Sequence, residues 1–153
     1  GSIVFLVSGV FGWAKPVPVN PRNFRDPSHG MMQVSLAGPM ANIFLAIVFA
    51  VIYKLLISSG LAVKMYASPI GAPILTMIGF SIFLNVALAV FNIIPIPPLD
   101  GSKVLMHYLP SSMVAGYANF ERYGFMILMF LVFSGVIGSV VLPVISFIVN
   151  FLI

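Results

Sequence analysis

The sequence has no cysteine and very little charge. It holds three acidic residues and seven lysines and arginines in 153 positions, so 7% of the chain is charged while 61% is hydrophobic. Without cysteine the chain forms neither disulfides nor thiolate metal sites. Soluble globular domains carry about 25% charged residues. So little charge excludes an ordinary soluble domain and makes lipid the expected solvent.

Long apolar runs stand where charge is missing. A helix needs about 20 apolar residues to cross a hydrocarbon core about 30 Å thick. Three runs are long enough, and we expect transmembrane helices at about 34–57, 72–95 and 125–152. Pro143 is expected to kink the last one. Because no charged or Gly/Ser-rich linker separates the runs, we predict an all-α integral membrane protein with a single membrane domain, 1–153.

The few basic residues indicate an orientation. Connections 13–33 and 95–124 hold five of the seven, whereas the opposite connection has only Lys54 and Lys64. Basic loops favour the cytoplasmic side of a membrane. Both polar loops are therefore predicted to be cytoplasmic. The basic residues form no patch, so no nucleic-acid partner is expected.

The first connection contains a proline-rich segment, residues 12–20. Each proline excludes helix and biases the residue before it towards extended backbone. We therefore expect a short extended, β-like loop at the membrane surface. Its free edge makes Val17 and Val19 candidates for binding an extended substrate by strand addition. The alternative is a loop that Trp13 anchors in the interface, and the residues themselves leave both interpretations open.

The first two spans contain polar and helix-disturbing residues, which are Gly38, Pro39, Asn42, Asn85, Asn92, Pro95 and Pro98. Helix breaks at membrane depth persist only where protein covers the freed backbone or a wet cavity borders it. The two breaks are therefore expected to face each other. For Asn85 we favour a packing role, with the amide bonded across a helix interface. For Asn42 and Asn92 packing and function are equally open.

Asp100 is the most conspicuous ionisable residue, because it ends a span without other charges and is followed by Gly101. An ionisable residue at such a position is a functional-site hypothesis, and an ordinary helix cap is the alternative. A metal would need further ligands, and the only histidines are His29 and His107. Neither has the close spacing that preorganises two ligands on one helix face. We predict that neither binds metal.

Three segments, in this order, resemble the site-2 protease family of intramembrane zinc metalloproteases, as found in its bacterial members. They are FGWAKPVPVN (11–20), AGPMAN (37–42) and FNIIPIPPLDG (91–101). The resemblance implies that Asp100 is the third zinc ligand, and that the first two are histidines of an H-E-x-x-H motif on an earlier helix. It also implies that Asn42 and Asn92 lie near a transmembrane protein substrate. A bacterial inner-membrane location follows from the same resemblance.

The sequence departs from the family at the catalytic motif. Its only glutamate is Glu121, so no H-E-x-x-H is present. We expect this chain to be the C-terminal portion of such a protease, inactive alone, with a preceding histidine-bearing helix completing the zinc site. The alternatives are a non-catalytic homologue that binds membrane segments and a fragment of a transporter with proline-broken spans.

Overall fold

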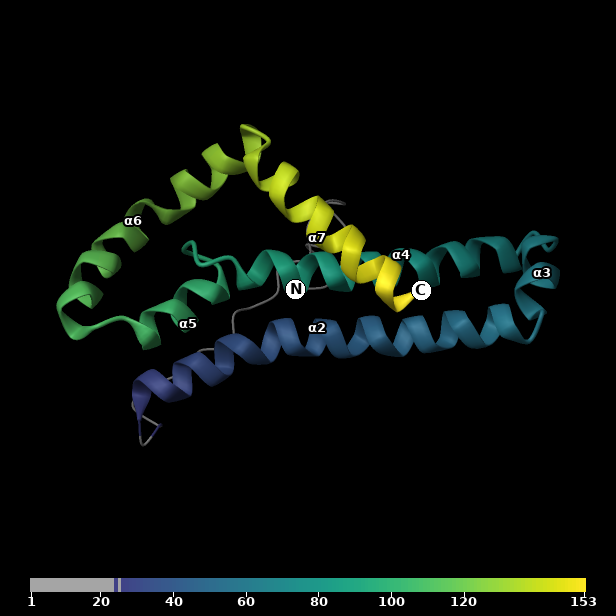
Figure 1. Cartoon of the computed structure of the whole chain (residues 1–153), viewed down its shortest axis with the longest axis horizontal. Coiled ribbons are helices and arrows are strands. Elements are labelled where there is room, and N and C mark those ends of the chain that lie inside the picture. Colours follow the sequence, from purple (N-terminus) through teal and green to yellow (C-terminus); the bar gives the residue numbers. More distant parts are fainter. Residues whose placement is uncertain (1–23, 25) are drawn as a thin grey trace, which may run out of the picture.

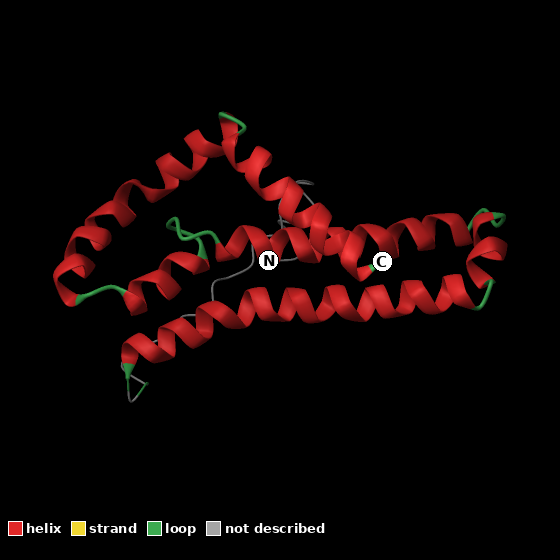
Figure 2. Cartoon of the chain, in the orientation of Figure 1, coloured by secondary structure: helices red, strands yellow, loops and turns green. Residues whose placement is uncertain are grey.

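The computed structural model describes Phe24 and residues 26–153, except for the side chains of Ala118 and Asn119. The helices are α2 (Pro27–Ser58), α3 (Leu61–Tyr66), α4 (Gly71–Ile93), α5 (Asp100–Tyr108), α6 (Ser111–Phe133) and α7 (Val136–Leu152). Figure 2 shows helices joined by short turns, with no strand among the described residues. The extended loop expected around Val17 and Val19 lies outside the described residues.

An antiparallel pair of long helices, α2 and α4, forms the centre of the molecule, and α7 crosses α4 (Figure 1). Ala46 of α2, Val86 of α4 and Ile145 of α7 are buried together where the three helices meet. Small residues such as Ala46 let helix backbones approach closely, which is how helices pack when lipid removes the usual hydrophobic drive. The short helix α3 joins the pair at one end, and α5 lies at the other.

The helices expose much of their apolar surface. Phe44 of α2 and Phe80 of α4 are 66% and 60% exposed, and Phe151 of α7 is 80% exposed. Such faces are unfavourable in water and suit lipid. Two helices, α2 and α4, are long and apolar enough to cross a membrane, and a bent pair brings the number up to three if it counts as one span. The all-α membrane fold is therefore confirmed.

The polar connections are shorter and more helical than we expected. Residues 27–33 belong to the first turns of α2, and the segment 95–124 contains α5 and the start of α6. Asp26 explains the early start of α2, because its Oδ1 accepts hydrogen bonds from the backbone N–H groups of Ser28 (3.0 Å) and His29 (3.2 Å). An aspartate N-cap followed by proline is a strong helix start.

The third predicted span is not one helix kinked at Pro143. It consists of α6 and α7, which meet at Ser134–Gly135 with a bend of 75° between 120–133 and 136–152. Gly135 has φ 78°, the left-handed conformation that glycine adopts most easily after a helix end. The helix α7 continues through Pro143. The glycine, rather than the proline, therefore redirects the chain.

Candidate active site

A compact turn, residues 94–99, connects the end of α4 to Asp100 at the first position of α5. The N–H of Ile96 donates to the carbonyl of Ile94 (2.8 Å), and the N–H of Leu99 donates to Ile96 (2.9 Å). Pro97 and Leu99 are buried. Three prolines deny this segment a helix, so α4 stops and the chain turns before α5 begins.

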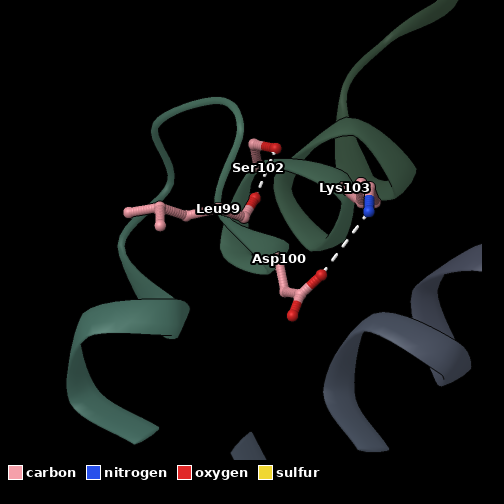
Figure 3. Close-up of polar contacts among 4 residues, drawn as sticks. All are labelled: Leu99, Asp100, Ser102 and Lys103. Carbon is pink, nitrogen blue, oxygen red and sulfur yellow. Dashed lines mark hydrogen bonds and ion pairs between the residues drawn. The ribbon is translucent and has the colours of Figure 1, made fainter. Parts of the chain in front are cut away.

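The start of α5 is fixed by close packing and by a hydrogen bond. A Cβ at Gly101 would overlap the backbone of Ile93 and Ile94, so α5 begins directly against the end of α4. The hydroxyl of Ser102 donates to the carbonyl of Leu99 at 2.7 Å (Figure 3). Only glycine permits so close a backbone approach. The position of Asp100 is thereby set by its neighbours on both sides.

The helix α6 covers the same turn from outside. A Cβ at Gly124 would meet the carbonyl oxygen of Pro97 at 2.5 Å, and the Tyr117 hydroxyl donates to the carbonyl of Pro95 at 3.0 Å. Burial raises the pKa of Tyr117, and the negative charge of Glu121 raises it further. The phenol therefore stays protonated at neutral pH and keeps its proton for this bond.

The carboxylate of Asp100 lies between α5 and α2. Its Oδ1 is 3.5 Å from the ammonium of Lys103, one turn along α5 (Figure 3), and the two side chains are 33% and 39% exposed. Its Oδ2 faces Gly38 of α2, where an added Cβ would be 3.7 Å away. Because glycine has no side chain, the α2 backbone leaves this oxygen uncovered. Asp100 and the Gly38–Pro39 segment are thus brought together.

A cavity of about 260 Å³ is bordered by α2, the end of α4 and α5, and its lining includes Gly101, the residue after Asp100. Pro39 and Ser35 come from α2, Asn92 and Pro95 from the break after α4, and Gly101 from α5. The two helix-disturbing segments therefore do face each other. Only one of them is a true break, because α2 runs without interruption through Pro39.

The other two asparagines have different surroundings. Asn42 is half-buried on α2, one turn beyond Gly38. Asn85 does not bond across an interface as we expected. Its side-chain amide donates to the carbonyl of Ser81 at 2.8 Å, within α4. An Asn that satisfies itself on its own helix needs no partner helix.

The two histidines lie closer together than their positions in the sequence indicate. The rings of His29 on α2 and His107 on α5 have centroids 5.6 Å apart. The Nδ1 of His107 is 2.9 Å from the Ser28 hydroxyl, and the Nε2 of His29 is 3.1 Å from the Gln33 amide. No group of three His, Cys, Asp or Glu side chains gathers as a metal site within the described part of the chain.

Sequence reasoning missed Ser35 and Tyr117. Ser35 is 2% exposed and lines the cavity, and Tyr117 ties α6 to the proline turn. A polar residue three positions before Gly38 was the available signal for Ser35. For Tyr117 the signal was absent, since a tyrosine near an interface is common in any membrane helix.

Comparison with known proteins identifies the family. The sequence model described as peptidase family M50 matches residues 20–135. YwhC of Bacillus subtilis, named as a candidate zinc metalloprotease, is 37% identical over 142 residues, which are 93% of this chain and 63% of that protein. Rip2 of Mycolicibacterium smegmatis, named likewise, is 34% identical over 66% of this chain and 35% of its own length.

A third relative, MJ0611 of Methanocaldococcus jannaschii, is also named as a candidate zinc metalloprotease and is 39% identical over 48% of this chain and 32% of its own length. The chain thus spans less than two thirds of each of these relatives. No solved structure matches it. Because the family match extends over most of the chain and includes the Gly38–Pro39 and Pro95–Gly101 segments, the protein belongs to peptidase family M50, the site-2 protease family.

Proposed function

We propose that this chain is the C-terminal portion of an intramembrane zinc metalloprotease that hydrolyses peptide bonds of transmembrane substrates, with Asp100 as the third zinc ligand. The observation that supports this is the position of Asp100. Its Oδ2 faces the Gly38 backbone, and Gly101, the next residue, lines a cavity together with Pro39 and Pro95. A partly exposed carboxylate held between α5 and the membrane helix α2 is the arrangement expected of a metal ligand.

No three potential zinc ligands gather among the described residues. The chemistry of the one available donor nevertheless fits, since carboxylate oxygens are ordinary zinc ligands and a catalytic zinc has three protein ligands. We propose that a preceding helix with an H-E-x-x-H motif supplies the two histidines. The greater length of the relatives leaves room for such a segment. Bound zinc would supply an activated water near neutral pH.

Four residues are proposed to bind the substrate. Asn92 lines the cavity next to Pro95, and Asn42 lies one turn along α2 from Gly38, which faces the carboxylate. They would hydrogen-bond backbone groups of the substrate. Val17 and Val19 would offer an extended edge to it. The latter two lie outside the described residues and rest on the sequence alone.

The orientation is also part of the proposal. The N-terminal end of α2 and the helix α5 lie at one end of the molecule, and α3 lies at the other (Figure 1). We propose that the first end faces the cytoplasm of a bacterial inner membrane. A topology reporter fused after Lys103 should then read cytoplasmic, and one fused after Ala67 should read outside. The reverse pattern would contradict the orientation.

The test uses the complete protein, including the residues that precede this sequence. Purified in detergent, it should contain about one zinc per chain and cleave a transmembrane peptide. Asp100→Asn should remove most of both, because an amide oxygen is a weaker ligand than a carboxylate. Asp26→Asn is the matched control, since it alters the other aspartate at a helix start, and asparagine caps helices equally well.

Metal analysis and cleavage assays give separate answers. If Asp100→Asn retains full zinc and full cleavage while Asp26→Asn does likewise, the ligand assignment is wrong. If the complete protein binds substrate peptides but shows neither zinc nor cleavage, it is a non-catalytic homologue.

A further inference from the structure

The cavity that Gly101 lines, next to Asp100 in the sequence, has a mainly apolar lining, with Asn92 and the buried Ser35 hydroxyl as polar groups. Its walls are formed mainly by Leu36, Pro39, Ile93, Pro95, Val104 and Leu105, and its volume is about 260 Å³. Ile93 and Tyr108 at its border are 55% and 73% exposed, so the cavity opens to the surface of the helices. A space of this size admits one large apolar side chain, but not a helix, whose diameter is about 10–12 Å.

Ser35 is the polar group that makes this cavity unusual. Its side chain is 2% exposed, and its Oγ has no hydrogen-bond partner among the described residues. Several other helix serines donate to a carbonyl of their own helix, as Ser81 does to Met77 at 2.7 Å and Ser139 does to Val136 at 2.9 Å. Buried hydroxyls are nearly always hydrogen-bonded. A hydroxyl that lines a cavity without a partner indicates a ligand with a polar atom.

A transmembrane substrate provides such an atom. To expose a peptide bond for hydrolysis, its helix must unwind locally, and each carbonyl released in this way loses its partner. In lipid no water replaces that partner, so the protein must donate instead. The side chain next to the released carbonyl is apolar, because the segment came from the membrane. The cavity matches this combination of one apolar side chain and one acceptor.

We propose that this cavity is the substrate subsite next to the cleaved bond, taking one apolar side chain of an unwound transmembrane segment while the Ser35 hydroxyl donates to a backbone carbonyl of that segment. The proposal rests on the proteolytic function proposed above. It adds the class of substrate residue that the site recognises, which is an apolar one. Ser35, on the α2 wall of the cavity, acts as a binding residue. Val104 bounds the same space from α5.

Disulfide trapping tests the location of the substrate. These 153 residues contain no cysteine, so Ser35→Cys gives a unique thiol once any cysteine outside them is replaced in the complete protein. Asp100→Asn prevents cleavage. The substrate is a transmembrane peptide that the unmodified protein cleaves. It is prepared as a series in which a single cysteine stands at successive positions. The control is Ser81→Cys, another serine within a membrane helix and not part of the cavity.

Ser35→Cys should crosslink one or two substrate positions next to the cleaved bond, at least about fivefold above Ser81→Cys. A flat profile equal to that of Ser81→Cys would overturn the subsite while zinc and cleavage by the unmodified protein still stand. If the unmodified protein cleaves no transmembrane peptide, the proteolytic function fails and the subsite fails with it.

Kinetics test the specificity independently. Val104→Phe fills the cavity from the wall opposite Ser35, so it should shift the preference at that substrate position from leucine towards alanine by about tenfold in kcat/KM, the scale at which apolar pockets discriminate. Ser35→Ala should lower kcat/KM about fivefold for both peptides, because it removes the donor and leaves the space. Thermal melting of each variant checks the fold. An unchanged leucine-to-alanine ratio in folded Val104→Phe would contradict the subsite.

Discussion

Two of the connections between helices differ in their surroundings. They are residues 94–99, between α4 and α5, and Ser134–Gly135, between α6 and α7. The first is covered by protein, since Pro97 and Leu99 are buried and Gly124 of α6 packs on Pro97. The second is bare, meaning that other parts of the described protein do not cover it. Apart from its chain neighbours, no described atom lies within 4 Å of the Cβ position of Gly135. The covered break fixes a carboxylate, whereas the bare one only redirects the chain.

The two breaks also satisfy their backbone differently. At the bare break the Ser134 N–H bonds Phe130 at 2.9 Å and the Gly135 N–H bonds Val132 at 3.1 Å, so the helix end caps itself. At the covered break the carbonyl of Pro95 depends on Tyr117, a residue of another helix. A break that depends on its neighbours holds them in place, and that is the condition for a preorganised site.

The largest expected effect separates two glycine substitutions. Gly101→Ala should destabilise the protein by about 1–3 kcal/mol, because the new methyl overlaps the α4 backbone and forces α5 away. Cleavage by the complete protein should fall at least about tenfold as Asp100 moves, since small displacements of catalytic groups are costly. Gly135→Ala should cost about 1–2 kcal/mol through left-handed backbone strain alone.

Unfolding in mixed detergent micelles measures both stabilities, and a peptide cleavage assay measures both activities. The contrast between the covered and the bare break holds if the two variants lose similar stability and only Gly101→Ala loses activity. Equal activity in the two variants would show that the covered break does not position Asp100.

A smaller effect is expected from the contact between α6 and the proline turn. Tyr117→Phe removes the hydrogen bond to the Pro95 carbonyl and should cost about 0.5–1.5 kcal/mol. Tyr123→Phe, on the same helix and 57% exposed, is the control and should change stability by less than about 0.5 kcal/mol. If both substitutions have the same effect on detergent unfolding, α6 does not hold the turn by this bond.

The sequence predicts the two main spans well because apolar length is a local property. The predicted segment 34–57 lies within α2, which begins seven residues earlier, and the segment 72–95 overlaps α4. The expected kink at Pro143 is wrong, because α7 continues through Pro143 and the bend lies at Gly135 instead. Which of two helix-disturbing residues bends the chain depends on whether neighbouring groups donate a hydrogen bond to the freed carbonyl, and a sequence does not show this.

The candidate site is predictable only where a motif exists. Asp100 and the Gly38–Pro39 segment are found from sequence, and the structure places them side by side. Ser35 and the approach of His29 to His107 were not expected, because the two histidines are 78 positions apart and meet only after α5 folds back along α2. Contacts of this kind come from tertiary packing, for which a single sequence carries no periodic signal.

The smallest expected effect concerns the partner of Asp100 within the covered break. Lys103 is one turn along α5 and 3.5 Å away, and both side chains are at least a third exposed, so solvent screens the pair. Lys103→Met keeps most of the side-chain length and should cost less than about 0.5 kcal/mol in detergent unfolding. In the complete protein it should leave the zinc content unchanged, because the carboxylate is free to turn to a metal once the ammonium is gone.

Met31→Leu on the nearby α2, which changes no charge, is the control for packing. A loss of cleavage in Lys103→Met with zinc retained would show instead that the ammonium contacts the substrate, and that the covered break contributes two functional groups where the bare one contributes none.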